Sequence, residues 1–351
     1  MTAGLPLRQL GTTDIQISRV GFGAWAIGGG GWSFAWGPQD DNDSIAAMRH
    51  AIERGINWID TAAVYGLGHS EEVVGRMLAG LAQENRPYIF TKCGMIWSDD
   101  RMKDAVRSLA HIRRECEASL RRLGVDRIDL YQFHWPDATG IPVEESWRVM
   151  EQLVDEGKVR AIGVSNFDAS LLRRIDSLRH VDSLQPPFSL IRRDAAAVEI
   201  PWCNAHRTGV IAYSPMQSGI LTDTFTADKV KQMPSDDWRK RSPNFQTPRL
   251  EKNIGLRDAL KPIAERRGTT VAAVAVAWTL AWPAVTGAIV GARSPQQVDG
   301  WLDAASLELT AGDLDEIARA IDRLGVGSGP TRPPSSMRRQ PAEGEAQIDA
   351  R

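Results

Sequence analysis

Three ionisable residues close short β-like runs in the first half of the chain, and a tyrosine lies close to them in sequence. Asp60, Lys92 and His134 follow apolar residues, and Tyr65 comes five positions after Asp60. A lysine ammonium about 4 Å from a phenol favours tyrosinate by about 4 kcal/mol at an effective dielectric of about 20. We therefore expect Lys92 to lower the pKa of Tyr65 from about 10 to about 7, with Asp60 holding Lys92 charged and in place.

Together these residue types can reduce a carbonyl group. Tyr65 would supply a proton, and His134 would hydrogen-bond the substrate oxygen or share the proton of Tyr65. A carbonyl held between the two is polarised for hydride attack. Each residue alone has a structural explanation: Asp60 as a helix cap, Tyr65 as a packed aromatic and His134 as a core histidine. Their place at successive strand ends favours catalysis, because an unpaired buried lysine such as Lys92 is rare.

The elements that would position these residues alternate between β-like and helical patterns. Helices are expected at residues 41–54, 71–81, 103–123, 143–156, 169–178, 194–207, 250–267, 271–280, 295–304 and 310–320. Eight strands separated by helices predict a parallel sheet that closes into a (β/α)8 TIM barrel, with catalytic residues at the carboxyl ends of the strands. The strands are expected at residues 20–23, 58–60, 88–92, 128–134, 161–165, 183–185, 210–214 and 288–291.

Three segments fall outside this alternation. Residues 7–18 predict an N-terminal β-hairpin around a polar turn. Residues 216–248 form a connection much longer than the ~2–6 residues usual in α/β units, which is typical of a functional or mobile loop. Residues 325–351 are rich in Gly, Pro, Ser and charge, and predict a disordered C-terminal tail. We therefore expect one barrel domain over residues 1–324, followed by the tail.

Composition excludes several classes of protein. The chain has 351 residues and a net charge of -2, so it lacks the basic excess of a nucleic-acid-binding protein. Its three cysteines have the spacing of neither a disulfide framework nor a metal site. The first residues lack a signal-peptide pattern, and the most apolar stretch, residues 271–290, is broken by Trp282-Pro283. We expect a soluble, cytoplasmic protein without nucleic-acid, membrane or metal partners, and its oligomeric state stays open.

The chain resembles the aldo-keto reductase superfamily from about residue 6 to about residue 320. It looks closest to the bacterial branch that includes general-stress and inositol-operon reductases. The motifs that carry the resemblance are GINWIDTAAVYG at residues 55–66, Thr91-Lys92, His134, GVSNF at 163–167, Gln185, Tyr213-Ser214-Pro215 and GARSPQQ at 291–297.

The resemblance implies an NADP(H)-dependent oxidoreductase that reduces small aldehydes or ketones, or oxidises the alcohols. It implies the catalytic tetrad Asp60, Tyr65, Lys92 and His134. Ser165, Asn166 and Gln185 would hold the nicotinamide carboxamide, and Tyr213 would stack on its ring. Arg293 would bind the adenosine 2′-phosphate, with Ser294 and Gln297 nearby. The remaining implied cofactor contacts are Gly23, Ala24, Trp25, Asp60, Ser214, Pro215, Met216, Ser218, Gly219 and Gly291.

The chain departs from the family pattern at two places. Trp301 stands where many members have asparagine, so that a contact to the adenine is lost or becomes stacking. Thr222-Asp223-Thr224 stands where many members have a Gly-Lys-Tyr stretch in the long loop. The second departure puts in doubt a lysine clamp on the pyrophosphate.

Two other functions compete with a reductase. One is a cofactor-binding sensor or regulatory subunit with vestigial turnover, which the intact tetrad disfavours. The other is a non-redox lyase or isomerase, which leaves Arg293 without a role. Five tryptophans fall in or near loops at the expected barrel mouth, and they form either an aromatic pocket or ordinary loop contacts: Trp25, Trp32, Trp36, Trp97 and Trp135.

Overall fold

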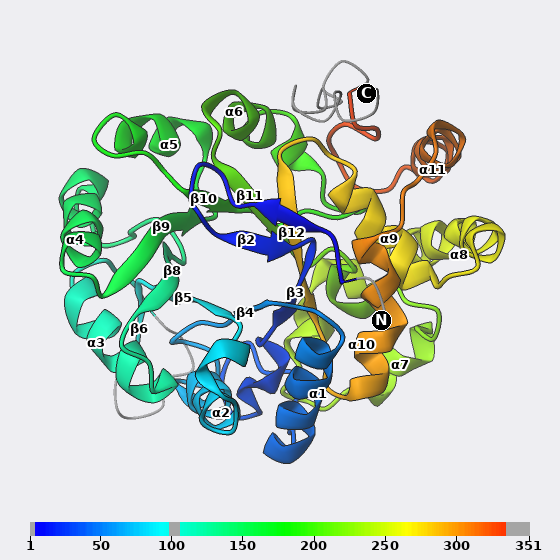
Figure 1. The fold of residues 1–351 in the computed structure, drawn as a ribbon. Coiled ribbons are helices and arrows are strands. Elements are labelled where there is room, and N and C mark those ends of the chain that lie inside the picture. Colours follow the sequence, from blue (N-terminus) through cyan, green and yellow to red (C-terminus); the bar gives the residue numbers. More distant parts are fainter. Residues whose placement is uncertain (1–3, 98–105, 335–351) are drawn as a thin grey trace, which may run out of the picture.

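A computed structural model describes residues 4–97 and 106–334 of the chain. Eight parallel strands close into a barrel in which each strand pairs with its neighbours along the chain, and β12 returns to β3 (Figure 1). The predicted (β/α)8 TIM barrel is therefore confirmed. The strands are β3 (Val20–Gly23), β4 (Trp58–Asp60), β5 (Tyr88–Cys93), β8 (Ile128–Phe133), β9 (Val159–Ser165), β10 (Ser183–Gln185), β11 (Gly209–Tyr213) and β12 (Val285–Gly291).

Helices surround the barrel (Figure 1). Local signals fix several of their ends: Asp40 caps α1 by accepting from the backbone N–H groups of Asn42 and Asp43, and Thr310 forms a capping box with Asp313 at the start of α11. The helices of the ring are α1 (Asp41–Glu53), α2 (His69–Ala79), α3 (Ile112–Leu123), α4 (Val143–Asp155), α5 (Ala169–Asp176), α6 (Glu199–His206), α8 (Arg249–Arg267), α9 (Val271–Leu280), α10 (Pro295–Leu302) and α11 (Ala311–Leu324). Within the described residues, no helix is long and apolar enough to cross a membrane.

The predicted N-terminal hairpin, β1 (Leu7–Gln9) with β2 (Gln16–Ser18), lies across the amino ends of the barrel strands (Figure 1). Its apolar side chains continue into the barrel interior, where they form one buried cluster with side chains from the strands. The members are Leu10, Ile15, Ile17, Trp58, Phe90, Leu130, Ala161, Ile211 and Ile289. This apolar layer closes one end of the barrel.

The predicted helix over residues 103–123 is wrong in its first part. Val106–Arg107 form strand β7, which pairs with β6 (Met95–Ile96), and α3 begins only at Ile112. The backbone between them is held by distant groups, since Leu109 N donates to Asp137 at 2.8 Å. Residues 98–105 lie outside the described residues.

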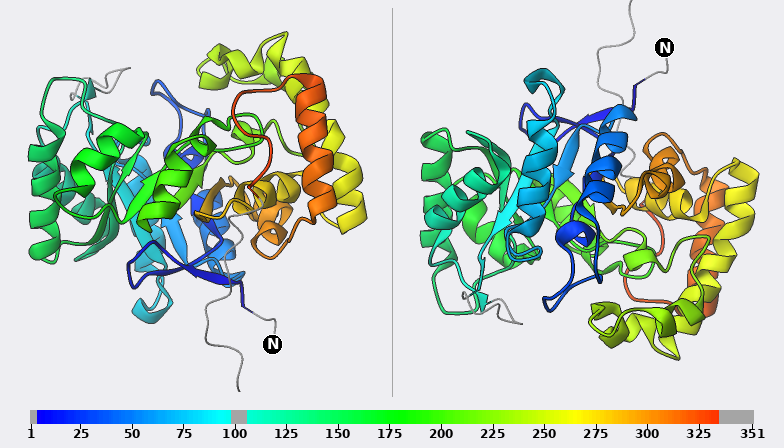
Figure 2. Two further views of the ribbon diagram at one scale, coloured as in Figure 1. Left: turned by 90° about the horizontal axis from the view of Figure 1, so that it is seen from above. Right: turned by 90° about the horizontal axis from the view of Figure 1, so that it is seen from below.

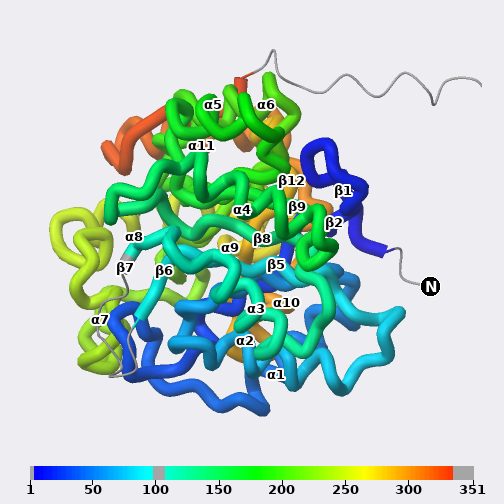
Figure 3. The backbone as a smooth tube through the Cα atoms, turned by 90° about the vertical axis from the view of Figure 1, so that its left-hand side faces the viewer, coloured from blue at the N-terminus to red at the C-terminus, as the bar shows by residue number. Residues whose placement is uncertain are grey.

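The long connection after β11 is structured and lies at the end of the barrel opposite the N-terminal hairpin (Figures 2 and 3). It contains α7 (Ala227–Gln232) and short 3₁₀ turns, among them Trp238–Arg241. Trp238 stacks on Trp25 of the loop after β3, with ring centroids 5.2 Å apart. The connection therefore docks on the carboxyl rim of the barrel, where the catalytic residues were predicted.

Part of the predicted C-terminal tail lies against the barrel. Val326 is buried, and the buried Arg193 donates hydrogen bonds to Val326 O at 3.0 Å and to Gly329 O at 3.3 Å. Gly327 has a φ of 60°, and a Cβ there would come within 1.9 Å of Ile191 O, so only glycine fits. The predicted disorder is therefore wrong for residues 325–334, and the rest of the predicted tail, residues 335–351, lies outside the described part.

Candidate active site

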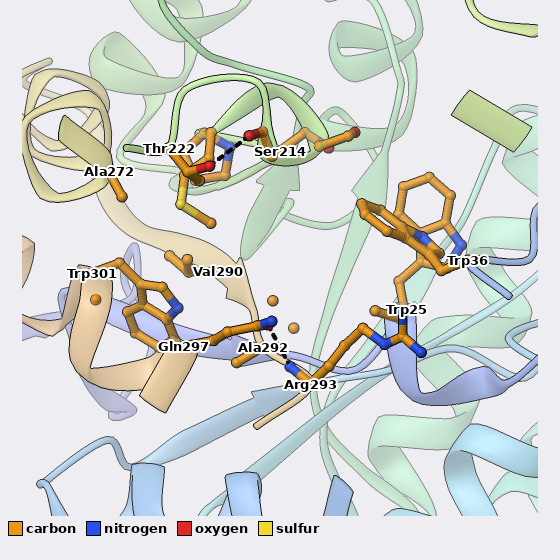
Figure 4. A pocket seen from close by; sticks show the side chains of 18 of the residues that line it. Trp25, Trp36, Ser214, Thr222, Ala272, Val290, Ala292, Arg293, Gln297 and Trp301 are labelled. Carbon is orange, nitrogen blue, oxygen red and sulfur yellow. Dashed lines mark hydrogen bonds between the residues drawn. The ribbon is translucent and has the colours of Figure 1, made fainter. Parts of the chain in front are cut away.

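A cleft of about 740 Å³ lies at the carboxyl ends of the barrel strands (Figure 4). Its walls come from the ends of β3, β4, β10, β11 and β12, from the long connection and from α10. Predicted residues that line it are Gly23, Ala24, Trp25, Asp60, Tyr65, Gln185, Tyr213, Ser214, Pro215, Met216, Ser218, Gly219, Gly291, Arg293 and Gln297. Lys92, His134, Ser165, Asn166 and Ser294 do not line it directly.

Strand alternation brings the acidic and basic groups together inside the barrel. Trp58, Phe90 and Leu130 fill the interior. Side chains two positions further along each strand point the same way, so Asp60, Lys92 and Gln132 converge above them. The sequence analysis did not identify Gln132. Its position two residues after Leu130 on a predicted strand could have indicated that its side chain points into the barrel.

The predicted catalytic residues form a connected chain of contacts. Lys92 Nζ lies 2.5 Å from Asp60 Oδ1, 2.8 Å from the Thr61 carbonyl oxygen and 3.4 Å from the Tyr65 hydroxyl. Gln185 Nε2 donates to the second Asp60 oxygen at 2.8 Å. Burial raises the pKa of Asp60 and lowers that of Lys92, and the attraction between the two charges opposes both shifts.

Burial also decides the protonation of Tyr65. It raises the pKa of the phenol well above 10, and the charge of Asp60 raises it further. Lys92 does not reverse this shift, because its ammonium is closer to Asp60 than to the phenol oxygen. The expectation that Lys92 lowers the pKa of Tyr65 to about 7 is therefore wrong for the free protein. Tyr65 is held as a phenol, the form that can donate a proton.

His134 lies edge-on to Tyr65, with ring centroids 5.6 Å apart and an interplanar angle of 79°. Its backbone is fixed on both sides: its N–H donates to Cys93 O at 2.9 Å, and its carbonyl accepts from Asn166 Nδ2 at 2.9 Å. Burial, with the charge of Lys92, lowers the pKa of His134 well below 6.5. A neutral imidazole therefore faces the phenol.

The residues expected to hold a carboxamide form one hydrogen-bonded network. Ser165 Oγ donates to Gln185 O at 2.8 Å, and Tyr213 OH donates to Asn166 Oδ1 at 2.9 Å. Asn166 has a φ of 62°, a conformation that costs energy outside glycine and is concentrated at functional sites. Gln185 and Tyr213 reach the cleft, while Ser165 and Asn166 support them from behind.

Strained backbone continues after β11. Ser214, Gln217 and Ser218 all have positive φ values, of 56°, 46° and 54°. Three such residues within one short turn are uncommon, and this turn lines the cleft through Ser214 and Ser218. The segment therefore holds its backbone groups in one defined arrangement at the cleft wall.

Two arginines share the part of the cleft near α10. Arg293 Nε donates to Gln39 Oε1 at 2.5 Å, and its Nη2 donates to the Pro38 carbonyl. Arg239, on the long connection, is held by the buried Asp237 at 2.6 Å and lies 4.3 Å from the Trp36 ring centroid. Burial and the like charge of Arg239 both lower the pKa of Arg293. Two neighbouring cations favour an anion between them.

Arg239 could be named from the sequence only as one of several basic residues in the loop, because its partners are distant in sequence. Ser294 occupies the N-cap position of α10 without a side-chain cap. Gln297 Oε1 accepts from Arg293 N at 2.9 Å. Gln297 therefore helps to orient the backbone at Arg293.

The predicted mouth tryptophans form one connected aromatic cluster. The ring centroids of Trp25 and Trp32 lie 6.2 and 6.3 Å from that of Tyr65, and Trp97 and Trp135 pack against the same buried residues. Trp25 also contacts Trp36, which lies beside Arg239 and Trp238. Within residues 4–97 and 106–334, no three His, Cys, Asp or Glu side chains converge on a position that could hold a metal ion.

Comparison with known proteins agrees with this geometry. The model of the Aldo/keto reductase family matches residues 19–322. The chain is 36% identical to the aldo-keto reductase YhdN of Bacillus subtilis, over 88% of this chain and 92% of that protein. It is also 36% identical to an NADH-specific methylglyoxal reductase of Escherichia coli, over 90% and 98% of the two chains.

Among solved structures, a glycerol dehydrogenase from Gluconobacter oxydans superposes with a TM-score of 0.81 and 38% identity, covering 90% of this chain and 95% of that one. The residues matched by the family model, 19–322, include all eight barrel strands and the residues that line the cleft. The chain therefore belongs to the aldo/keto reductase family.

Proposed function

We propose that this oxidoreductase uses NADP(H) to interconvert small aldehydes or ketones and their alcohols, with Tyr65 as the general acid. The observation that carries the proposal is the contact chain from Asp60 through Lys92 to Tyr65, in the same cleft that holds Arg239 and Arg293. The first group can move a proton, and the second can bind a phosphate.

The residues of the cleft fit a phosphorylated dinucleotide. Its volume of about 740 Å³ accommodates an extended ligand. Gln185 and Tyr213 would hold the nicotinamide end, with Ser165 and Asn166 behind them. Arg293 would bind the 2′-phosphate, and Arg239, which lines the same cleft, would contact this group or the pyrophosphate. When bound, the nicotinamide gives a hydride to the carbonyl carbon or takes one from the alcohol.

Side chains of the protein would carry out the proton transfer. Tyr65 donates its phenolic proton to the carbonyl oxygen as negative charge develops there. Lys92 Nζ, 3.4 Å from the phenol oxygen, stabilises the tyrosinate that remains, and Asp60 keeps that ammonium in position. The neutral His134 donates a hydrogen bond to the same substrate oxygen. In the oxidative direction the tyrosinate takes the proton back.

The choice between the two nicotinamide dinucleotides is the finer part of the proposal. A relative with 36% identity is named as NADH-specific, so family membership alone does not decide it. The convergence of Arg293 and Arg239 supports the 2′-phosphate, because hydrogen bonds to charged groups contribute about 1.5–3 kcal/mol each. The cytoplasmic location, and the expectation that the chain binds no nucleic acid, membrane or metal, stay predictions.

Steady-state assays test the proposal. The purified chain should oxidise NADPH when methylglyoxal or other small aldehydes are added, with a kcat/KM for NADPH well above that for NADH. Tight NADPH binding without turnover on a broad aldehyde and ketone panel would instead identify the regulatory or sensor protein. Faster turnover with NADH would overturn the 2′-phosphate assignment and leave the reductase assignment intact.

A further inference from the structure

A largely buried carboxyl group outside the cleft has no part in the proposed chemistry. Glu115 lies on α3, in the ring of helices around the barrel (Figure 1). Its Oε2 accepts from Gly94 N at 3.0 Å, and its Oε1 is buried without a hydrogen-bond partner among the described residues. A buried oxygen without a donor is uncommon, because leaving it unpaired costs free energy. Packing alone therefore does not explain this side chain.

One peptide group connects Glu115 to the catalytic residues. Gly94 follows directly on β5, two residues after Lys92. The N–H of the Cys93–Gly94 peptide donates to Glu115, and the carbonyl oxygen of the same peptide accepts from His134 N at 2.9 Å. Hydrogen bonds in series polarise one another, so the acceptor on the N–H side strengthens the bond on the carbonyl side.

The same corner of the chain leads to the wall beside the phenol. Gly94 has a φ of 83°, a conformation that favours glycine, and its carbonyl oxygen accepts from Ser108 N at 3.1 Å. The next strand, β6, runs on to Trp97, which packs in the cluster beside Tyr65. The orientation of the Gly94 peptide therefore affects both sides of the catalytic group.

No lysine or arginine forms an ion pair with Glu115 in the part of the chain that the structure describes. Arg122 instead binds Glu71 at 2.6 Å, and Arg114 is exposed. Burial raises the pKa of Glu115 to about 7, and the charge of Glu71 raises it further. The Gly94 N–H and the charges of the two arginines oppose this rise.

Two groups of the barrel wall also interact with Glu115. They are the Cys93 thiol on β5 and the Tyr131 phenol on β8, and burial raises the pKa of each well above its usual value. Both stay neutral at neutral pH. Of these three groups, Glu115 alone changes its charge there.

A glutamine at this position would offer Gly94 N an acceptor without a charge to bury. A buried charge without a partner lowers stability, so stability alone favours the amide over the carboxylate. What the carboxylate adds is strength, because a charged acceptor forms a hydrogen bond roughly twice as strong as a neutral one.

We propose that Glu115 is a positioning residue, which as a carboxylate holds the Cys93–Gly94 peptide and thereby fixes the backbone of His134 for turnover. The same peptide closes the strand that carries Lys92. This inference rests on the proposed function. Because the carboxyl group loses its proton near neutral pH, the hold strengthens as the pH rises through that range and then stays constant.

The pH dependence of kcat tests the role in turnover. In the wild-type chain, kcat for aldehyde reduction should rise about 2- to 5-fold from about pH 5.5 to about pH 8, because the charged acceptor is the stronger one. Glu115→Gln keeps an acceptor that cannot ionise, so its kcat should stay at the low-pH value throughout. The KM for NADPH should not change, since neither Glu115 nor Gly94 lines the cleft. Glu117→Gln is the matched control and should keep the wild-type step, because Glu117 on the same helix binds Lys158 at 3.0 Å.

A second measurement needs no turnover. Cys93–Gly94 is the only Cys-Gly pair in the sequence, so a chain labelled with ¹³C-carbonyl cysteine and ¹⁵N-glycine gives one amide resonance from this peptide. In the wild-type chain this resonance should shift with a midpoint at the pKa of Glu115, about 7. The shift should be absent in Glu115→Gln and present in Glu117→Gln.

Thermal unfolding shows that Glu115→Gln is folded. Its Tm should exceed that of the wild-type chain at pH 8 and approach it at pH 5, because the raised pKa of Glu115 makes only the ionised form destabilising.

The outcomes separate this proposal from the one on which it rests. A Gly94 resonance that does not titrate in the wild-type chain, or that titrates equally in Glu115→Gln, overturns the hold on the peptide. A Glu115→Gln chain whose kcat follows the wild-type pH profile overturns the role in turnover and leaves the reductase assignment intact. A wild-type chain that reduces no carbonyl overturns the proposed function, and the role of Glu115 in turnover with it.

Discussion

At the scale of single residues, burial rather than a neighbouring cation sets the state of Tyr65. An ammonium lowers the pKa of a phenol only while its charge is not compensated. Here Asp60 compensates Lys92 at 2.5 Å, so the effect of desolvation on Tyr65 prevails. A phenol that keeps its proton until charge appears on a substrate oxygen is well matched to carbonyl reduction.

Tyr65→Phe should lower kcat for aldehyde reduction by about 10²-fold or more, because general acid catalysis contributes about 10²–10⁴-fold. The Kd for NADPH should hardly change, since the phenol is proposed to donate a proton to the substrate and not to bind the cofactor. Stopped-flow reduction and fluorescence titration measure the two quantities. Tyr88→Phe is the control and should keep wild-type turnover, because Tyr88 lies at the start of β5, at the other end of the strand from Lys92. Wild-type turnover in Tyr65→Phe would remove the residue from the mechanism.

The pH dependence of reduction follows from the directions of two pKa shifts. The pKa of His134 is lowered, so the imidazole is neutral above about pH 6.5; that of Tyr65 is raised, so the phenol stays protonated beyond about pH 10. The reductive kcat/KM should therefore be level between about pH 7 and about pH 9. A tenfold decline per pH unit beginning near neutrality would show that the pKa of Tyr65 is instead lowered.

Arg293→Ala should weaken NADPH binding by roughly 10- to 150-fold and NADH binding little, because only NADPH carries the phosphate that the guanidinium would bind. Isothermal titration with both cofactors measures the difference. Arg148→Ala, an exposed arginine of α4 outside the cleft, is the matched control. Equal losses for NADPH and NADH would assign Arg293 a purely structural role.

The sequence pointed to Asp60, Lys92 and His134 as catalytic candidates because each lies at or next to a strand end, where position along the strand also gives the direction of the side chain. It did not identify Gln39 or Gln132, and it indicated Arg239 only as one of several basic residues in the long loop. Gln39 and Arg239 take part only through tertiary contacts, with Arg293 and with Asp237 and Trp36. Local patterns carry no information about such pairs.

At the scale of elements, the long connection after β11 is held to the rim by aromatic and charged contacts. Trp238 stacks on Trp25, and the guanidinium of Arg239 lies 4.3 Å from the Trp36 ring centroid. Lys229 and Arg239 line the cleft, whereas Lys240 Nζ donates to Met233 O and Arg241 to Ser33 O. Only part of the basic charge in this loop is therefore available to a bound phosphate.

We expect residues 216–248 to close on the cofactor. Their amide hydrogen exchange should slow when NADPH is added, and binding traces should contain a second phase whose rate does not depend on NADPH concentration. The N-terminal hairpin, at the far end of the barrel, is the internal control and should exchange at an unchanged rate. Unchanged exchange across 216–248 at saturating NADPH would contradict a clamping role.

Element prediction succeeded where the signal was local. The runs at 20–23, 58–60 and 183–185 match β3, β4 and β10 residue for residue. It failed at 106–111 because the two residues of β7 pair with β6 and Leu109 is held by Asp137, and both contacts are long-range.

At the scale of the whole molecule, the segment after α11 ties the last helix to the loop after β10. Arg193 is buried, and its guanidinium donates hydrogen bonds to the backbone carbonyl oxygens of Leu190, Val326 and Gly329. Composition alone could not show this, because the contact depends on a buried guanidinium more than 130 positions earlier in the chain.

Deletion of residues 325–351 should therefore destabilise the chain by about 1–3 kcal/mol, because Arg193 loses acceptors that it cannot replace while buried. Deletion of residues 335–351 keeps those contacts and should leave Tm unchanged. Thermal unfolding of the two truncated chains beside the full chain makes the comparison. Equal Tm values for all three would mean that the contacts of Arg193 contribute nothing to stability.

The hairpin and the apolar layer below Asp60 and Lys92 also limit the side from which a proton can reach the Tyr65 phenolate. In the described part of the chain, Leu10, Ile15 and Ile17 are fully buried and fill the axis beneath the ion pair. In the proposed mechanism each reduction would consume the phenolic proton, and water could return it only through the mouth, which product would still occupy after the chemical step. Tyr65 would thus be re-protonated after the product leaves and before the next substrate binds. A slow return of the proton would limit kcat and leave kcat/KM untouched.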